Sequence, residues 1–242
     1  MRLSVIVPAY NEGQVIMNNL IEIRKALEPY IDSFEILAVD DGSSDNTKEE
    51  ILKASSVYKE IKYAGYEKNR GKGGAIKHGV SAASGDVIGF IDADLDLAPD
   101  HIVRFLEHMD KTGCDVVIGS KMHKDSNLEY PAARKFVSWG YYILLKVLFG
   151  MKTKDTQTGI KIYKAPLVKK IAPELKVSGY AFDIEVLALC AAEGAVIDEM
   201  PVNIVFKRNG SFGRIRLKDI FTMFFDTVGI WWNLKIRRSY FK

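Results

Sequence analysis

Short apolar runs alternate with stretches of helical periodicity along the first half of the chain. The runs consist mainly of Val, Ile, Leu and Phe and are apolar at nearly every position. Strands of this kind are covered on both faces, which is typical of a parallel sheet between two layers of helices. The runs occupy residues 3–7, 34–39, 61–64, 87–91 and 116–118, and helical patterns occupy residues 15–27, 47–57 and 75–83. We therefore predict an α/β fold with a mostly parallel central sheet.

The composition is that of a globular protein with a core of its own. The chain has 242 residues, of which 48% are hydrophobic and 27% are charged. These values exclude a disordered chain and a protein that crosses a membrane many times. We expect one domain over residues 1–212, followed by a basic amphipathic tail over residues 213–242.

Cysteine and histidine do not point to a metal or a disulfide. Cys114 and Cys190 are far apart and form no Cys-x-x-Cys pair, so we expect two reduced, buried thiols. His101 and His108 are seven positions apart on one predicted helix, where we expect them to face solvent. We assign a role to none of the four histidines.

Polar residues follow the apolar runs at the points where the strands should end. In an open parallel sheet, ligands bind outside the carboxyl ends of the strands, so these segments are expected to share one crevice. They are residues 8–12, 40–45, 69–74 and 92–96.

Three aspartates in alternating positions follow the apolar run 87–91. If the extended conformation continues, the side chains of Asp92, Asp94 and Asp96 project to one face and crowd their carboxylates together. A hard cation such as Mg²⁺ or Mn²⁺ takes oxygen ligands of this kind and bridges them to phosphates. The alternative is a helix-capping cluster, and we expect Asp100 to be the cap of a helix beginning at His101.

The glycine-rich residues 70–79 fit neither the P-loop nor the dinucleotide-binding pattern. Two interpretations remain: a basic helix entrance whose Lys72 approaches an anion, or a plain turn with close helix packing. Asp40 and Asp41 are likewise consistent with a simple Asp-Gly turn or with recognition of a nucleotide base, with Tyr10 packed near the ring.

Taken together, the motifs resemble those of the inverting family 2 glycosyltransferases, above all the enzymes that load glucose or mannose onto dolichyl or polyprenyl phosphate. The motifs are PAYNE at 8–12, VDDGSSD at 39–45, NRGKGGA at 69–75, DAD at 92–94, GSK at 119–121, DTQTGIKIY at 155–163 and FDIEVL at 182–187. The resemblance covers about residues 3–212. It implies a GT-A fold, a nucleotide-diphosphate sugar donor such as UDP-glucose or GDP-mannose, a divalent metal and a lipid phosphate acceptor.

The resemblance also implies roles for individual residues. The residues expected to bind the nucleotide sugar are Pro8, Tyr10, Glu12, Asp40, Asp41, Lys72 and Asp92. Those expected to hold Mg²⁺ or Mn²⁺ are Asp92, Asp94 and Asp96. The expected catalytic residues are Asp94, Lys121, Arg134 and Asp155, and those expected at the acceptor phosphate are Arg134, Ser138 and Arg208. Two positions depart from the family pattern: Asp96 replaces a Gln, and Lys121 replaces an Arg that would bind phosphate in a bidentate manner.

The acceptor determines whether a general base is needed. A lipid phosphate is already ionised near neutral pH, whereas a hydroxyl acceptor must lose a proton. Asp155 and Asp183 are the candidate bases, although Asp183 and Glu185 are equally consistent with a helix start. A family 2 enzyme acting on a polysaccharide or soluble hydroxyl, and a non-catalytic membrane-docked subunit, are the alternatives.

Positive charge is concentrated at the C-terminus. Residues 214–242 contain seven Lys or Arg and two Asp, a local charge of +5, together with seven of the 26 aromatic residues. The charge suits lipid head groups or nucleic acid, and the aromatic residues favour lipid. Residues 136–151 and 215–241 resemble interfacial helices rather than spanning ones, and the first of them could instead pack on the sheet or form a homodimer face. Because no secretory signal opens the sequence, we expect a peripheral protein on the cytoplasmic face of a membrane.

Overall fold

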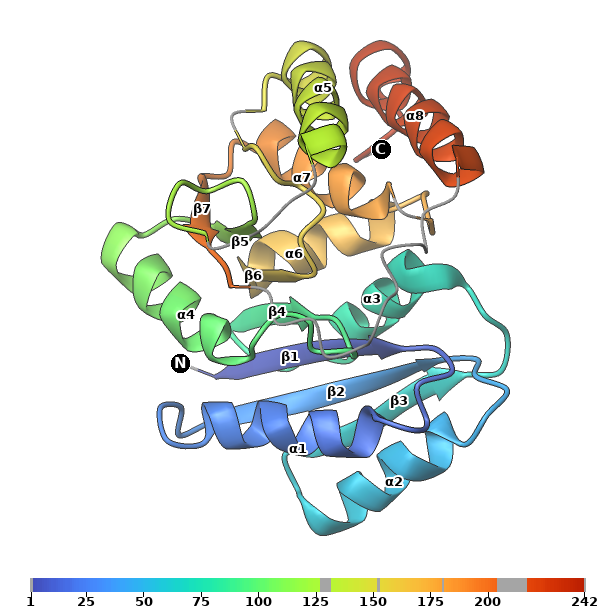
Figure 1. Ribbon diagram of the computed structural model, residues 1–242, viewed down its shortest axis with the longest axis vertical. Helices are drawn as coiled ribbons and strands as arrows, with labels where there is room; N and C mark the ends of the chain where they lie inside the picture. The colour runs from blue at the N-terminus through green and yellow to red at the C-terminus, as the bar shows by residue number, and fades with distance from the viewer. Residues whose placement is uncertain (1, 127–131, 152, 180, 204–216, 242) are drawn as a thin grey trace.

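The computed structural model describes residues 2–126, 132–151, 153–179, 181–203 and 217–241, with the backbone alone over 132–138 and 217–220. Within these residues, seven strands form one sheet and helices lie on both of its faces (Figure 1). The strands are β1 Leu3–Ala9, β2 Phe34–Asp41, β3 Ile61–Tyr66, β4 Val87–Ile91, β5 Val116–Ser120, β6 Ile160–Lys164 and β7 Ile197–Pro201. The helices are α1 Ile16–Leu27, α2 Thr47–Val57, α3 Gly71–Ala82, α4 Asp100–Thr112, α5 Ala132–Phe149, α6 Ala165–Ile171, the 3₁₀ helix η1 Ala172–Glu174, α7 Phe182–Ala192, α8 Leu217–Trp231 and the π-helix η2 Trp232–Arg237.

The sheet has the strand order β3-β2-β1-β4-β6-β5-β7. Each neighbouring pair is parallel except the two pairs that contain β6, which runs antiparallel to both β4 and β5. The mostly parallel α/β sheet predicted from the apolar runs is therefore confirmed. The reversed strand β6 was not among those runs, because lysine alternates with apolar residues along it.

Both faces of the sheet are packed, which explains why its strands are apolar at successive positions. Along β1, Val5 and Val7 belong to the core beneath α1, α2 and α4, whereas Ile6 belongs to the core beneath α3, α6 and α7. β4 divides in the same way, with Val87 on one side and Phe90 on the other. Side chains on a strand alternate between the two faces, so a strand covered on both sides has no solvent-facing positions.

Helix α4 differs from two expectations. It begins at Asp100, and the residue before it is Pro99, so Asp100 lies inside the first turn and its side chain makes no capping bond. The carboxylate there still interacts favourably with the positive end of the helix dipole. The expectation that His101 and His108 face solvent is also wrong: His101 is buried, and the half-buried His108 contacts Asp198 on β7.

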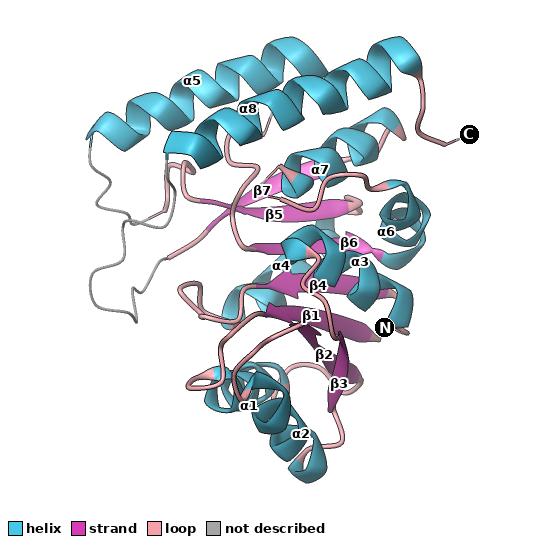
Figure 2. Cartoon of the chain, turned by 90° about the vertical axis from the view of Figure 1, so that its right-hand side faces the viewer, coloured by secondary structure: helices cyan, strands magenta, loops and turns pink. Residues whose placement is uncertain are grey.

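Helices α5 and α8 form an outer layer. α5 and α8 lie side by side above α7 in both views (Figures 1 and 2), and the Tyr141 hydroxyl is 2.6 Å from the Thr227 hydroxyl. The end of the chain returns to the core, where the buried Tyr240 hydroxyl donates to Glu185 of α7 at 2.6 Å. A division after residue 212 lies outside the described residues and stays a prediction. Among the residues that the structure describes, no helix is long and apolar enough to cross a bilayer.

A buried carboxylate ties three strands together at the amino ends of the sheet. Glu35 on β2 accepts hydrogen bonds from the Ser4 hydroxyl at 2.6 Å, from the Ser84 backbone N–H at 2.8 Å and from the Lys62 ammonium at 2.6 Å. Burial acts to raise the pKa of Glu35, but these donors outweigh it and lower the pKa to about 2. The ionised form is therefore much more stable in the folded chain than in the unfolded one.

We predict that Glu35 makes folding stability depend on acid. A depressed folded pKa contributes stability that is complete above the unfolded value of 4.5 and is lost as the pH falls toward 2. At pH 3 the wild-type chain should have lost about 2 kcal/mol from this group, a loss that Glu35→Gln does not show. Urea unfolding at pH 6 and pH 3 measures both, with the exposed Glu107→Gln as the control. Equal acid losses in wild type and Glu35→Gln would contradict the prediction.

Candidate active site

The carboxyl ends of β1, β2, β3 and β4 meet at one edge of the sheet, as expected. The register places Ala9 beside Asp40 and Asp41 beside Tyr66. The loops that follow β1 and β2 are bound to each other: the Asn11 N–H donates to the Ser43 hydroxyl at 3.0 Å. Asn11 also has a left-handed φ of 54°, which turns the chain sharply after β1.

This loop pair holds the residues expected at the nucleoside. Tyr10 is exposed beside it, with 49% of its surface accessible, and Pro8 lies near the end of β1. The Glu12 N–H donates to the Thr47 hydroxyl at 2.8 Å, so its backbone is fixed to the start of α2. The structure thus brings Pro8, Tyr10 and Glu12 together with Asp40, while their contacts to a nucleotide stay a prediction.

Asp41 organises the next loop. Its carboxylate accepts hydrogen bonds from the Tyr66 hydroxyl at 2.6 Å, the Arg70 N–H at 2.8 Å and the Asn69 amide at 3.0 Å. The neighbouring Asp40 accepts the Ser43 N–H at 3.0 Å. Both are buried, and each holds a loop in a defined shape. Asp41 therefore fixes the conformation of residues 69 and 70, which lead into the glycine-rich start of α3.

The three metal-candidate aspartates lie on a turn and not on a continued strand. β4 ends at Ile91, the Asp92 carbonyl accepts the Leu95 N–H at 3.2 Å, and Leu95 has a left-handed φ of 50°. The expectation that the extended conformation continues through residues 92–96 is therefore wrong, because a tight turn follows the strand directly. Burial still alternates through this turn: Asp92, Asp94 and Asp96 stay half-buried between buried apolar neighbours.

Lys72 lies opposite these aspartates in the first turn of α3. Its ammonium forms an ion pair with Asp92. Desolvation acts to lower the pKa of Lys72, but the negative charges of Asp92, Asp183 and Asp94 outweigh it and raise the pKa above its usual value. These carboxylates therefore concentrate negative charge in the site, which strongly stabilises a cation there.

Glycines let the first turn of α3 approach its neighbours. Gly71 has a φ of 77°, and a Cβ there would lie 2.6 Å from the Ser178 carbonyl oxygen. The Gly73 N–H donates to the same oxygen at 3.2 Å. The glycines therefore allow the close packing that places Lys72, while the approach of Lys72 to a bound anion stays a prediction.

The segment 153–159 forms a second wall of the candidate site, in addition to the first turn of α3. The Asp92 N–H donates to the Gly159 carbonyl at 3.1 Å, and a Cβ on Gly159 would lie 2.1 Å from an Asp92 carboxylate oxygen. Asp155, also in this segment, is nearly buried. Its carboxylate accepts the Lys121 N–H at 2.8 Å and the Gln157 N–H at 3.3 Å. The structure thus brings the expected residues Lys121 and Asp155 together.

Sequence reasoning missed the two residues that hold this wall. Glu199 on β7 accepts the backbone N–H groups of Lys154 and Asp155 at 2.7 and 3.0 Å. Lys161 on β6 is 1% exposed, and its ammonium lies 2.6 Å from Asp183 at the start of α7. The one available signal was a lysine between isoleucines in the segment 160–162, because a buried lysine needs an acidic partner.

Asp183 and Glu185 both have structural partners. Asp183 pairs with Lys161, and the fully buried Glu185 accepts the Lys176 N–H at 3.0 Å and the Val177 N–H at 2.9 Å. Since residues 177 and 178 pack on the first turn of α3, α7 also supports Lys72.

The expected acceptor residues are described only in part. Arg134 and Ser138 lie four residues apart on α5, where the structure describes the backbone alone, and Arg208 lies outside the described residues. Their contacts with a phosphate therefore stay predictions.

A divalent ion suits the donor set. Asp92 and Asp94 supply hard oxygen ligands, and their negative charges already stabilise the ammonium of Lys72. Within the described part of the chain, the three aspartates do not form a cluster whose oxygens all lie within 4.8 Å of one another. Such a site matches Mg²⁺ or Mn²⁺ bound by one or two carboxylates and completed by phosphate oxygens.

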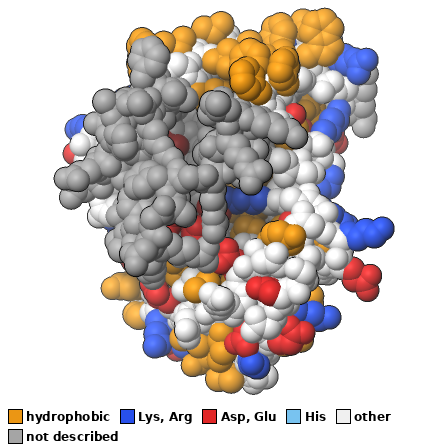
Figure 3. All heavy atoms as spheres, turned by 45° about the vertical axis from the view of Figure 1, so that its right-hand side comes forward, with side chains coloured by type: hydrophobic (Ala, Val, Ile, Leu, Met, Phe, Trp, Pro, Cys, Tyr) orange, Lys and Arg blue, Asp and Glu red, His pale blue; other side chains and the backbone are white. Residues whose placement is uncertain are grey.

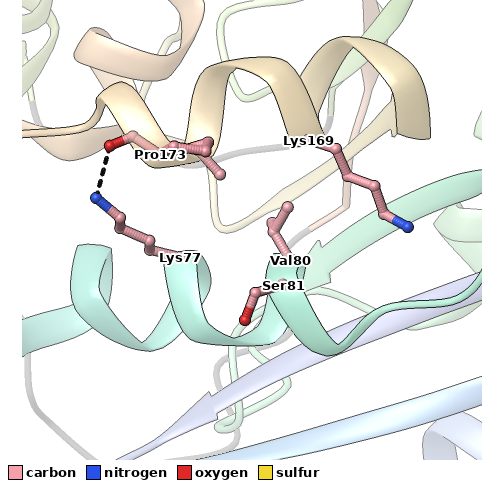
Figure 4. A pocket seen from close by; sticks show the side chains of 6 residues that line it. Lys77, Val80, Ser81, Lys169 and Pro173 are labelled. Atoms are coloured by element: carbon pink, nitrogen blue, oxygen red, sulfur yellow. Dashed lines mark hydrogen bonds between the residues drawn. The ribbon is translucent and has the colours of Figure 1, made fainter.

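A second hollow lies away from this crevice, between α3 and α6 (Figure 4). Its lining includes Val80 and Ser81 from α3 and Lys169 from α6. Lys77 spans its edge, and its ammonium donates to the Pro173 carbonyl at 2.8 Å. Because the lining is mainly aliphatic and this lysine is engaged, the hollow contributes nothing to the candidate site.

Comparison with known proteins gives a consistent result. The profile of Glycosyl transferase family 2 matches residues 4–172. The chain is 31% identical to a dolichyl-phosphate beta-glucosyltransferase of Saccharomyces cerevisiae, over 83% of this chain and 66% of that protein. It is 33% identical to a protein of the same name in Dictyostelium discoideum, over 83% and 65%, and 30% identical to a dolichol-phosphate mannosyltransferase of Pyrococcus furiosus, over 91% and 61%. This chain thus spans slightly less than two thirds of the length of these relatives.

The fold is also that of a solved enzyme. Glucosyl-3-phosphoglycerate synthase from Mycobacterium tuberculosis, in complex with Mn²⁺, UDP and glucosyl-3-phosphoglycerate, matches with a TM-score of 0.68 at 21% identity, over 96% of this chain and 79% of that one. A complex of the same protein with Mg²⁺ and UDP matches with a TM-score of 0.65. The expected GT-A fold is therefore confirmed.

We predict that Gly159→Ala disables the metal and nucleotide site without unfolding the chain. The new methyl group displaces the Asp92 carboxylate and breaks its ion pair with Lys72. Displacing a ligand through its support weakens metal affinity by about 10- to 100-fold. Calorimetric titration with Mn²⁺ and UDP measures the loss, and Gly229→Ala, which meets no atom within 4 Å, is the matched control. Unchanged binding in Gly159→Ala would show that Asp92 is not a ligand.

Proposed function

This chain belongs to glycosyltransferase family 2, and we propose that it transfers a hexose from a nucleotide-diphosphate sugar to a polyprenyl or dolichyl phosphate. The observation that carries the proposal is the cluster of Lys72, Asp92 and Asp94, with Gly159 packed against Asp92. We infer that UDP-glucose is the preferred donor, because several similar proteins are named dolichyl-phosphate beta-glucosyltransferases and the structural neighbour described above is in complex with UDP. GDP-mannose is the competing donor, since one relative is named a mannosyltransferase.

The donor side provides for departure of the nucleoside diphosphate. In this proposal the nucleoside lies against the paired loops that carry Tyr10 and Asp40, and the diphosphate lies beside Lys72. Asp92 and Asp94, with Asp96 beside them, would hold Mg²⁺ or Mn²⁺, which supplies positive charge against the developing charge of the leaving group. Lys72 exchanges its carboxylate partner for a phosphate oxygen and stabilises the same charge.

The acceptor side suits an ionised nucleophile. The oxygens of Asp155 accept N–H groups of Lys121 and Gln157, so this carboxylate orients Lys121. We assign Lys121, with Arg134, Ser138 and Arg208, to the acceptor phosphate. A phosphate oxygen attacks the sugar C1 from the face opposite the diphosphate, the C1–O bond to the diphosphate breaks, and the configuration inverts. Because the nucleophile carries no proton to remove, no general base is needed.

An apolar surface lies over the helices that adjoin the acceptor side. Apolar side chains gather over α5 and α8 at the top of the molecule in Figure 3. Val147 on α5 and Phe225 on α8 are 77% and 68% exposed. The other exposed large apolar residues of α5, α8 and the adjoining η2 are Trp139, Ile143, Phe221, Phe224, Trp232 and Ile236. A soluble chain rarely exposes so many large apolar side chains on two neighbouring helices.

We assign this surface to an anionic lipid bilayer. Cationic side chains adjoin the apolar ones: Lys146 on α5, and Lys235, Arg237 and Arg238 at the end of the chain, are all exposed. Apolar groups at the acyl boundary with cations at the head groups define an interfacial helix pair. Such docking brings the enzyme to a lipid phosphate. The cytoplasmic face stays our prediction for the side of the membrane.

We predict that the enzyme places label from UDP-glucose into an organic-extractable product in the presence of polyprenyl phosphate and Mn²⁺. Asp94→Asn should lower this transfer by about 100-fold or more, because one ligand of the leaving-group cation is lost. Parallel reactions with GDP-mannose measure the donor preference.

The exposed Asp110→Asn on α4 should retain full transfer. Label recovered only on a water-soluble hydroxyl acceptor would replace the lipid-phosphate proposal with the polysaccharide alternative. Full activity of Asp94→Asn in EDTA would remove the metal assignment.

We predict that the double variant Val147→Glu, Phe225→Glu releases the protein from vesicles of phosphatidylcholine and phosphatidylserine. Withdrawing two inserted apolar side chains should weaken binding by roughly tenfold or more. Vesicle flotation measures the bound fraction, which should also fall with added salt.

Val57→Glu is the control, since Val57 is 64% exposed at the end of α2, on the opposite side of the molecule (Figure 1). Undiminished flotation of the double variant would exclude α5 and α8 as the membrane contact.

A further inference from the structure

Three side chains of the types that ligate metals meet at the opposite end of the sheet from the candidate active site. His108 of α4, Cys114 before β5 and Asp198 of β7 place one ligand atom each within 4.8 Å of the other two. The His108 Nε2 and the Asp198 Oδ2 are already 2.8 Å apart. Among the described residues, this is the one group of three or more His, Cys, Asp or Glu side chains with such spacing.

The local fold holds the two sequence-near ligands in place. α4 ends at Thr112, and Gly113 takes a left-handed φ of 74°, which turns the chain back so that Cys114 follows at once. The Thr112 hydroxyl donates to the His108 carbonyl at 2.9 Å and accepts the Cys114 N–H at 3.4 Å. The segment 108–114 is therefore a closed turn that presents an imidazole and a thiol on one side.

Asp198 completes the group from a different part of the chain. Its register partner on β5 is Val117, and the neighbouring pair joins Val116 to Ile197. The pairing of the two strands therefore decides that Asp198 stands beside Cys114. The Cys114 side chain is 1% exposed, whereas His108 and Asp198 are 30% and 34% exposed. A metal here would be bound to a buried sulfur and would keep an open position toward solvent.

We propose that His108, Cys114 and Asp198 form a zinc site. A neutral imidazole, a thiolate and a carboxylate are all ligands of Zn²⁺, and the two negative charges neutralise the ion. In a tetrahedral complex, neighbouring ligand atoms lie roughly 3.4–3.6 Å apart. The His108–Asp198 pair reaches this spacing when its contact lengthens by about half an ångström. On binding, the thiol proton leaves to solvent and the S–Zn bond forms.

The site would join the end of α4 to the edge strand β7. The residue after Asp198 is Glu199, whose carboxylate holds the backbone of Lys154 and Asp155 in the active-site wall. In this proposal zinc cross-links the end of α4 to β7, and the proposal is independent of the proposed transferase function and of the oxygen-ligand site at Asp92.

Cobalt provides the test, because Co²⁺ replaces Zn²⁺ and shows an intense charge-transfer absorption only when it binds a thiolate. The full chain is stripped with EDTA, exchanged into excess Mg²⁺ to fill sites of oxygen ligands, and titrated with Co²⁺. We expect the thiolate band to saturate at one Co²⁺ per chain and to disappear when Zn²⁺ is added. An absence of the band in the wild-type chain overturns the proposal.

Variants locate the site. Cys114→Ser should abolish the band, whereas Cys190→Ser, which alters the other buried thiol, should retain it. His108→Gln and Asp198→Asn change half-exposed side chains and should weaken Co²⁺ binding by at least tenfold. They also decide the result if Cys114→Ser fails to fold. A band that persists unchanged in both of these variants, or that depends on Cys190, would overturn the assignment.

Discussion

Lys161 carries a positive charge into the interior of the protein, and it is stable there because Asp183 lies 2.6 Å away. Removing one partner of a buried pair leaves an uncompensated charge, at a cost of about 3–5 kcal/mol. The pair joins the antiparallel strand β6 to the start of α7. α7 in turn supports the loop against which Gly71 and Gly73 pack, so the position of Lys72 depends on it. The interior ion pair thus connects the reversed strand to the part of the candidate site that contains Lys72.

The site is assembled by close approaches that leave no room for a side chain. Gly159 abuts the carboxylate of Asp92, and Gly71 abuts the carbonyl of Ser178. With both walls fixed, the ammonium of Lys72 is held at the aspartates. A preorganised charge array of this kind needs little rearrangement when charge develops on a leaving group. The closely packed backbone therefore holds Lys72 and the aspartates in the positions that the proposed stabilisation of the leaving group requires.

The outer helices are part of the same packed structure. Tyr240, three residues beyond η2, donates its hydroxyl to the fully buried Glu185, and Ile230 of α8 is buried in the core that contains α7. α8 presents apolar side chains to the outside, while Ile230 on its inner face packs in the core that contains α7. The apolar surface that we assign to lipid is in this way attached firmly to the helix that supports Lys72.

The local sequence pattern predicted the strands covered on both faces, the acids at the end of β4 and the amphipathic C-terminal helices, because each of these depends on residues that are close together in the sequence. The local sequence pattern did not predict the turn at Leu95, because alternating acidic and apolar residues do not show where an extended strand ends. Contacts between distant segments were decided by tertiary structure alone. Asp92 meets Gly159 and Asp198 meets Cys114 because of the strand order and register, in which β6 is inserted between β4 and β5. Periodicity reports which side of an element is buried, and only the packed sheet decides which element lies against it.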